Sequence, residues 1–208
     1  MHGVTAQATK PPEPATRNPQ PMRHLPNILT LGRFALIPCF LWASMRQMYT
    51  AAFVIFVTAA VTDILDGAIA RRMNLRSKLG AFLDPAADKT LMVCGFLYYT
   101  LAELPRVGIP AWLTFTVFIR DVLIVFFVYL MYTRIQITRF PPSVWGKTST
   151  VLQAVTLACA VAVNAFLPSF YGFAQLLFLL SLLMTLFSGW DYMRRASNLV
   201  REQVPAEA

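Results

Sequence analysis

The chain has 208 residues, of which 57% are hydrophobic and only 13% are charged, and its mean hydropathy is +0.55. Because a soluble domain carries about 25% charged residues, this composition excludes a soluble cytosolic or secreted protein. The net charge of +8 suits either a nucleic-acid partner or a membrane surface, and the placement of the basic residues decides between the two.

Residues 1–22 form a segment rich in Pro, Thr, Ala and Gln, without apolar periodicity. Such a segment buries too little apolar surface to offset its ordering entropy, so we expect a disordered cytoplasmic tail. A cleavable signal peptide needs an apolar stretch near the N-terminus, and this tail has none. We expect one membrane domain over residues 23–198, followed by a C-terminal tail over residues 199–208.

Six apolar segments follow the tail, and each is close to the roughly 20 residues that a membrane-spanning helix needs. They cover approximately residues 27–47, 51–71, 80–102, 110–133, 148–167 and 172–193. Prolines gather near the breaks between segments, where helices are expected to end or begin. The sequence therefore predicts an all-α polytopic membrane protein with six transmembrane helices.

The basic residues predict how these helices are oriented. Most of the 18 basic residues would lie on one side of the membrane, in the N-terminal tail, the second loop, the fourth loop and the C-terminal segment. The opposite side would hold only Arg46 and Arg106. Because cytoplasmic loops carry the excess of Lys and Arg, we expect both termini to face the cytoplasm. Anionic headgroups then account for the positive charge, and no nucleic-acid partner is expected.

Five of the ten acidic residues lie inside the first four predicted membrane helices: Asp63, Asp66, Asp84, Asp88 and Asp121. Ionisable groups there are costly and mark functional sites by default. The alternative is a set of salt bridges between helices. The basic residues available for such pairs are Arg33, Arg71, Lys89 and Arg120.

Spacing places the first four of these aspartates on two helix faces. Asp63 and Asp66 are three residues apart, and Asp84 and Asp88 are four apart, so each pair shares one face of its helix. The two helices are joined by a short loop and therefore run antiparallel. Both aspartate pairs are expected at a similar depth near the cytoplasmic end.

Four carboxylates that converge in a low-dielectric site could not all remain ionised alone. Divalent cations that prefer oxygen ligands would compensate them, and Mg²⁺ or Mn²⁺ suits all-carboxylate ligation. A site with two metal ions is also a recurrent arrangement for displacement at phosphorus.

Small residues lie beside the aspartates and leave the helix faces bare. Gly67, Ala70 and Gly80 would let a ligand approach the backbone closely, although tight helix packing is the alternative explanation. Arg71 follows Ala70 and is well placed to bind a diphosphate.

These residues together resemble the signature of the CDP-alcohol phosphotransferase (CDP-alcohol phosphatidyltransferase) family. All eight fixed positions are matched in the stretch Asp63-x2-Asp66-Gly67-x2-Ala70-Arg71-x8-Gly80-x3-Asp84-x3-Asp88. Residues 25–33, with the sequence LPNILTLGR, are similar to the family's first span.

The resemblance implies a six-helix fold, usually homodimeric, that binds CDP-diacylglycerol and two Mg²⁺ or Mn²⁺ ions. It implies metal ligation by Asp63, Asp66, Asp84 and Asp88, and it makes Asp88 the base that takes the proton of the acceptor hydroxyl. The same resemblance gives Gly67, Ala70, Arg71 and Gly80 the role of a cytidine-diphosphate pocket. The protein would lie in a membrane, a bacterial inner membrane in our reading, with its active site at the cytoplasmic face.

The acceptor alcohol is predicted less directly. The pair Arg120-Asp121, followed by Gly146-Lys147-x2-Thr150-x2-Gln153, resembles the branch that makes phosphatidylglycerol and cardiolipin. Phosphatidylglycerophosphate synthases usually show Arg-Glu there and another arginine eight residues after the first, whereas this chain has Asp121 and Val128. We therefore favour phosphatidylglycerol as acceptor, as in cardiolipin synthases of the mitochondrial type. Glycerol 3-phosphate is the alternative.

The expected acceptor-binding residues are Arg120, Asp121, Lys147 and Arg76. A cation-coupled transporter is an alternative class of function, because transporters also carry intramembrane carboxylates. That class predicts internal repeats and carboxylates near the midplane. The chain shows no repeat, and its aspartates gather at one membrane face.

Overall fold

The computed structural model describes residues 25–73, 78–135 and 143–203. These residues form α1 (Leu25–Met45), α2 (Tyr49–Met73), α3 (Lys78–Leu101), α4 (Ala111–Ile135), α5 (Val144–Ala165), the short 3-10 helix η1 (Pro168–Phe170) and α6 (Tyr171–Gln203). No strand occurs in these ranges, so the predicted all-α class is confirmed. The expected tail over residues 1–22 lies outside the described residues.

Three of the six long helices are long and apolar enough to cross a membrane, judged by length and composition within the described ranges. These spans are Ala111–Leu130, Val144–Ala165 and Pro168–Asn198. Two shorter apolar stretches, Gly32–Met45 and Tyr49–Leu65, lie in α1 and α2. The described residues therefore contain the six predicted helices, and three of these helices are candidate membrane spans.

The sixth helix is longer than its apolar segment. The sequence predicts an end near residue 193, but α6 continues to Gln203. Asp191 accepts a hydrogen bond of 2.9 Å from Arg195 Nε, one helical turn further on. Such pairs four residues apart stabilise a helix beyond its apolar part. Hydropathy alone therefore locates the membrane span but not the end of the helix.

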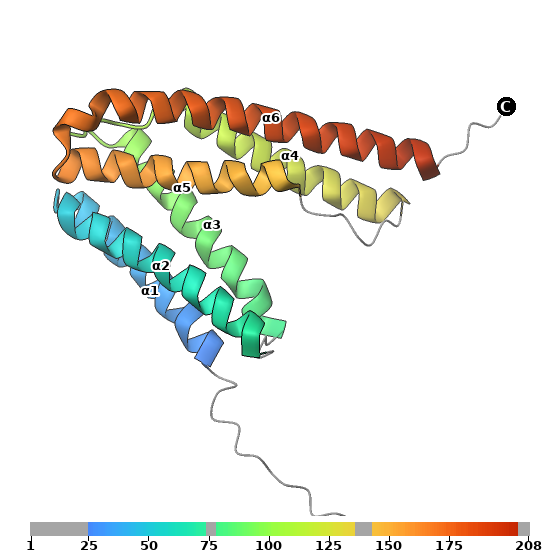
Figure 1. Ribbon diagram of the computed structural model, residues 1–208, viewed down its shortest axis with the longest axis horizontal. Helices are drawn as coiled ribbons and strands as arrows, with labels where there is room; N and C mark the ends of the chain where they lie inside the picture. Colours follow the sequence, from blue (N-terminus) through green and yellow to red (C-terminus); the bar gives the residue numbers. More distant parts are fainter. Residues whose placement is uncertain (1–24, 74–77, 136–142, 204–208) are drawn as a thin grey trace, which may run out of the picture.

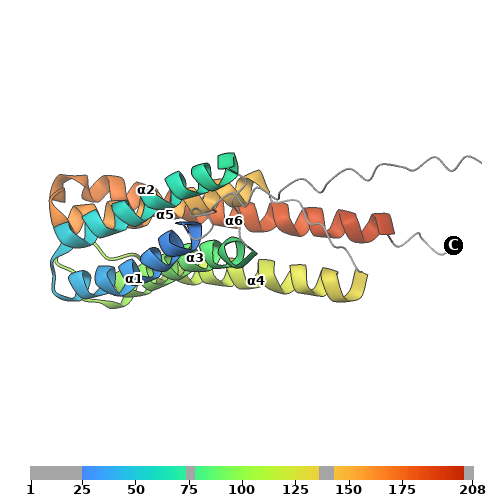
Figure 2. The ribbon, with the colours of Figure 1, turned by 90° about the horizontal axis from the view of Figure 1, so that it is seen from below.

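The helices form two groups that meet at one end of the molecule and diverge toward the other (Figure 1). In the first group α1 packs on α2 and α3, and in the second α6 packs on α4 and α5. The α2–α5 contact joins the groups, and α3 makes smaller contacts with α4 and α5. Seen from below, α2 and α5 lie along one side of the molecule, while α1, α3 and α4 lie along the other (Figure 2).

Buried aromatic side chains and a polar cap fix the end where the groups meet. Phe40 packs against Phe56 and Tyr99, with ring centroids 5.8 and 6.3 Å apart. Asn164, near the end of α5, donates to the backbone oxygen of Val107 at 2.7 Å and accepts from the backbone nitrogen of Arg106 at 3.1 Å. The segment between α3 and α4 is thereby tied to α5. A buried polar side chain with all these partners stabilises the apolar interior.

The opposite, diverging end carries the start of α1, the end of α2, the start of α3 and the end of α6 (Figure 1). The basic residues of the sequence predict that this end faces the cytoplasm. The aspartates of α2 and α3 lie toward the same end. The fold thus places the candidate site in the more open half of the molecule.

Candidate active site

The centre of the site is formed by side chains from α1, α2 and α3. Asp63 lies ten residues before the end of α2, and Asp88 lies ten residues after the start of α3. At 1.5 Å per residue, both lie about 15 Å from the end that the two helices share. The two helices therefore bring these aspartates to the same depth, as the spacing predicts.

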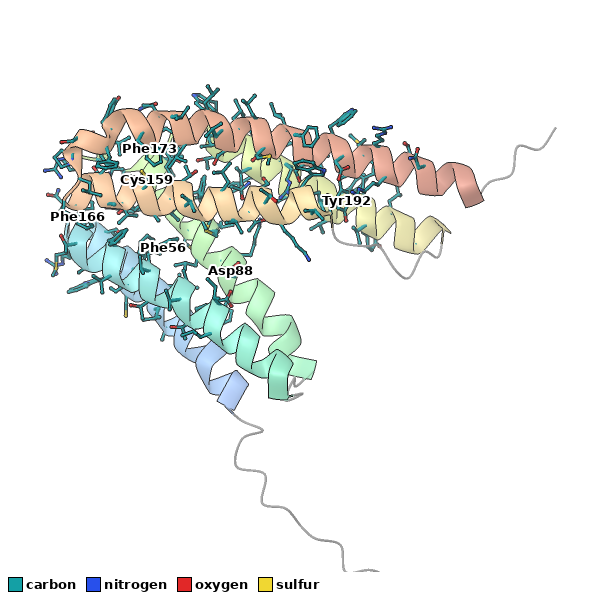
Figure 3. All side chains as sticks on the ribbon, in the orientation of Figure 1. Phe56, Asp88, Cys159, Phe166, Phe173 and Tyr192 are labelled. Carbon is teal, nitrogen blue, oxygen red and sulfur yellow. The ribbon has the colours of Figure 1, made fainter. Side chains whose placement is uncertain are left out.

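A buried arginine is paired with the first of these two aspartates. Arg33 on α1 places Nη1 2.7 Å from Oδ1 of Asp63. The Arg33 side chain is 2% exposed, whereas that of Asp63 is 39% exposed. Asp88 is half-buried and lies on the side of α3 that faces α2 (Figure 3). Its carboxylate is repelled by Asp63 and attracted by Arg33 and Lys89.

The remaining signature residues are described only by their helix positions. Asp66, Gly67, Ala70 and Arg71 belong to α2, and Gly80 and Asp84 belong to α3. Their side chains lie outside the described part of the structure, as does all of Arg76. By register, Asp66 lies about one turn beyond Asp63, and Asp84 about one turn before Asp88. The helices therefore place the four aspartates in one region, at the level of the backbone.

The described side chains fit a divalent cation in their chemistry. Asp63 and Asp88 carry two negative charges, and Arg33 supplies one positive charge. All candidate ligands are carboxylate oxygens, which suit Mg²⁺ or Mn²⁺. Among the residues with described side chains no group of three metal-ligating residues forms, so the predicted four-carboxylate set rests on Asp66 and Asp84 as well.

A second charged cluster connects α3, α4 and α6 beside the first. Lys89 Nζ, on the residue that follows Asp88, forms an ion pair with Oδ2 of Asp121. Arg120 donates from Nη1 to Oδ1 of Asp121 at 2.9 Å and from Nη2 to Ser188 Oγ at 2.6 Å. The structure thus brings together Arg120 and Asp121, two of the expected acceptor-binding residues. It adds Lys89, which the sequence indicates only as one of the basic residues available for salt bridges between helices, and Ser188, for which the sequence gives no signal.

The motif residues at the start of α5 differ in their burial and in their contacts. A Cβ atom at Gly146 would lie 3.5 Å from Nη2 of Arg120, an ordinary van der Waals contact, so this glycine borders the buried guanidinium. Lys147 is exposed in the first turn of α5. Gln153, in contrast, is fully buried and donates to Thr185 Oγ1 of α6 at 3.1 Å. Gln153 therefore contributes to helix packing rather than to a substrate pocket.

Two apolar grooves flank the second cluster. The groove between α3 and α4 has a volume of about 630 Å³, and its charged residues are Lys89 and Asp121. Its remaining walls are apolar and aromatic, formed by Val93 on α3 and by α4 residues from Phe118 to Tyr129. A second cavity of about 290 Å³ lies between α4 and α6, beside Arg120.

The fold and these side chains define an all-helical integral membrane protein in which an aspartate of α2 is paired with a buried arginine of α1. Residues 23–187 match the CDP-alcohol phosphatidyltransferase family, and the chain belongs to this family. The prediction drawn from the aspartate signature is therefore confirmed at the level of the family.

Relatives of two kinds are similar to the chain. A cardiolipin synthase (CMP-forming) of Homo sapiens is 30% identical over 193 residues, which cover 85% of this chain and 63% of the human protein. The chain thus spans less than two thirds of that relative. A CDP-diacylglycerol–glycerol-3-phosphate 3-phosphatidyltransferase of Aquifex aeolicus is 28% identical over 179 residues, covering 85% of this chain and 98% of that protein. A probable phosphatidylglycerophosphate synthase of Mycobacterium tuberculosis is 33% identical over 186 residues, covering 83% and 81%.

Proposed function

We propose that this chain is a phosphatidyltransferase of anionic phospholipid synthesis. It transfers the phosphatidyl group of CDP-diacylglycerol to a glycerol-type alcohol and releases CMP. The observation that carries this proposal is that Asp63 and Asp88 lie at equal depth on α2 and α3, with the buried Arg33 paired to Asp63 and attracting Asp88. Membership of the family supplies the class of reaction.

In this reaction the acceptor hydroxyl oxygen attacks the β-phosphorus of CDP-diacylglycerol. The bond between that phosphorus and the oxygen of CMP breaks, and the hydroxyl proton passes to a carboxylate oxygen of Asp88. A general base of this kind contributes about 10²–10⁴-fold to a rate. Asp88 is suited to it because it is half-buried and faces the other carboxylate helix.

The other signature residues would bind the activated lipid. Mg²⁺ or Mn²⁺, held by Asp63, Asp66, Asp84 and Asp88, would neutralise the diphosphate when bound. Gly67, Ala70 and Gly80 would leave room for the cytidine diphosphate, and Arg71 would bind its phosphate oxygens. These assignments follow from the resemblance and from the helix positions of the residues.

Phosphatidylglycerol is the acceptor that the groove between α3 and α4 favours. The groove is apolar along α4, and its lining includes Lys89, the neighbour of Asp88. A lipid with one phosphodiester charge could place its acyl chains along α4 and its glycerol hydroxyl near Asp88. Glycerol 3-phosphate carries nearly two charges and needs cationic partners, yet Lys89 and Arg120 are both paired with Asp121.

Glycerol 3-phosphate is the second candidate, because relatives of both kinds are similar to the chain. In that case Lys147 and Arg76 would supply the missing cationic partners beside the pair formed by Arg120 and Asp121. The product would be phosphatidylglycerophosphate instead of cardiolipin.

The test uses purified protein, labelled CDP-diacylglycerol and one acceptor at a time. We expect cardiolipin and CMP when phosphatidylglycerol is supplied with Mg²⁺ or Mn²⁺. If the protein forms phosphatidylglycerophosphate from glycerol 3-phosphate and forms no cardiolipin, the acceptor is glycerol 3-phosphate and not phosphatidylglycerol. If no acceptor leads to release of CMP, the proposed transferase activity is wrong.

A groove-filling variant tests the route of the acceptor. Val93→Trp places an indole in the groove between α3 and α4 and is expected to raise KM for phosphatidylglycerol. The matched control is Val155→Trp on the exposed face of α5, which should leave that KM unchanged. An unchanged KM for phosphatidylglycerol in Val93→Trp would show that the acceptor does not bind in this groove.

We further propose that the chain is a multi-pass protein of a bacterial inner membrane, with the diverging end of its helices at the cytoplasmic face. The basic segments next to that end support this orientation. Residues 23–198 would form the membrane domain between two tails, and the resemblance supports a homodimer. Labelling of single cysteines from either side of the membrane would test the orientation.

A further inference from the structure

Arg33 is a buried charge that the transfer chemistry does not use. It lies in α1, at the end of the segment whose sequence resembles the family's first span. Its side chain is 2% exposed, and its Nη1 is 2.7 Å from Oδ1 of Asp63. A charged arginine inside a membrane protein is costly unless it is paired, so its pairing with a proposed metal ligand calls for an explanation.

The geometry at Asp63 lets Arg33 and a divalent cation compete for the same carboxylate. Arg33 approaches the carboxylate from the protein interior, while 39% of the Asp63 side chain remains exposed. A divalent cation could reach that carboxylate from its open side. Arg33 also attracts Asp88, which Asp63 repels. Without Arg33 and without a metal ion, Asp63 would lose this ion pair, and of the two cations that attract Asp88 only Lys89 would remain.

We propose that Arg33 is a positioning residue that acts as the internal counter-cation of the carboxylate site. It holds Asp63 and stabilises the metal-free protein, and its hold on Asp63 is weakened when a divalent cation binds there. The inference rests on the proposed metal site, and it deepens that proposal by giving the metal-free state its own charge balance.

Linkage gives the sign and the size of the effect. Arg33 stabilises the metal-free state more than the metal-bound state, so it lowers the affinity for the divalent cation. By reciprocity, removal of its charge must raise that affinity by the same factor. Coupling between two such sites is typically about 5- to 150-fold. A residue that only supported the fold would lower the affinity or leave it unchanged.

The experiment measures Mn²⁺ binding to the purified full-length protein by the electron paramagnetic resonance signal of free Mn²⁺. Arg33→Gln is expected to bind Mn²⁺ at least about fivefold more tightly than the wild type. The matched control is Arg106→Gln, because Arg106 donates to the backbone oxygens of Val163 and Asn164 at the other end of the molecule. That variant loses structural hydrogen bonds and should keep wild-type Mn²⁺ affinity. Unchanged or weaker binding by Arg33→Gln would overturn the inference.

Thermal unfolding with and without Mn²⁺ gives a second readout. Mn²⁺ should raise the unfolding temperature of Arg33→Gln more than that of the wild type, and Arg33→Lys should resemble the wild type. If Arg33→Gln folds only when Mn²⁺ is present, the inference is supported; if Mn²⁺ does not restore it, the inference is wrong.

The two proposals fail in different ways. If Asp63→Asn binds Mn²⁺ as tightly as the wild type does, Asp63 does not bind the metal. Both the metal site of the proposed function and the proposed role of Arg33 would then be wrong. Binding that depends on Asp63 but is insensitive to Arg33→Gln would overturn only the role of Arg33.

Discussion

Substitution of Asp121 by Asn would remove the anion that Lys89 and Arg120 share. Asp121 is 15% exposed, and Arg120 is 9% exposed, so their pair is largely buried. Lys89 is 45% exposed and can turn toward water. Because the neutral amide cannot balance the guanidinium, Asp121→Asn leaves a buried charge on α4 that is hydrogen-bonded to Ser188 and the Asn oxygen but has lost its anion.

The pair of Arg120 with Asp121 is expected to contribute more to the free energy of unfolding than the pair of Lys89 with Asp121. Breaking a buried ion pair by removing one partner costs about 3–5 kcal/mol. The low end applies here, since the Asn oxygen still accepts a hydrogen bond from Arg120. An exposed pair contributes about 0–1 kcal/mol, so Lys89→Met should cost less than Asp121→Asn. With about 2–4 °C per kcal/mol for a chain of this size, Asp121→Asn should lower the unfolding temperature by about 6–12 °C.

The assay is thermal unfolding of the purified variants in the same detergent. The double variant Arg120→Met/Asp121→Asn should recover part of the loss, because it removes the buried charge together with its partner. Equal shifts for Asp121→Asn and Lys89→Met would refute this reasoning, since they would show that burial does not set the strength of the cluster. A double variant less stable than Asp121→Asn would refute it as well.

Three further predictions concern the metal, the acceptor and the motif on α5. A chelator should abolish turnover, and Mg²⁺ or Mn²⁺ should restore it; full turnover by metal-free protein would rule out the proposed site. Val128→Arg adds the arginine usual in phosphatidylglycerophosphate synthases and should not improve turnover with phosphatidylglycerol; a clear gain would count against the apolar route along α4. Gln153→Met should lower stability by about 0.6–1.7 kcal/mol without changing KM for the acceptor, whereas a raised KM would place Gln153 in the acceptor site.

The helices and the relative depth of the aspartates could be predicted from sequence because both depend on local periodicity. Apolar length and breaker residues locate each helix. Antiparallel helices joined by a short loop then bring Asp63 and Asp88 to one level. The end of α6 could not be predicted in this way, because polar pairs such as Asp191 and Arg195 extend the helix beyond its apolar segment.

The partners of the charged residues could not be predicted, because they depend on how the helices rotate and pack. The sequence indicates catalytic carboxylates and interhelical salt bridges as alternatives, whereas the structure pairs Asp63 with Arg33 and Asp121 with Lys89. Lys89 and Asp121 are 32 residues apart, so no helical spacing relates them. Gln153 shows the same difficulty, since its motif position does not reveal that it is buried against α6.

The central claim, that an intramembrane aspartate drives phosphatidyl transfer, is tested most directly by CMP release from Asp88→Asn. With CDP-diacylglycerol, phosphatidylglycerol and Mg²⁺, this variant should lose about 10²–10⁴-fold in turnover while still binding CDP-diacylglycerol. The matched control is Glu103→Gln, an exposed acid between α3 and α4, which should release CMP at the wild-type rate. CMP release by Asp88→Asn at a near-wild-type rate would contradict the account.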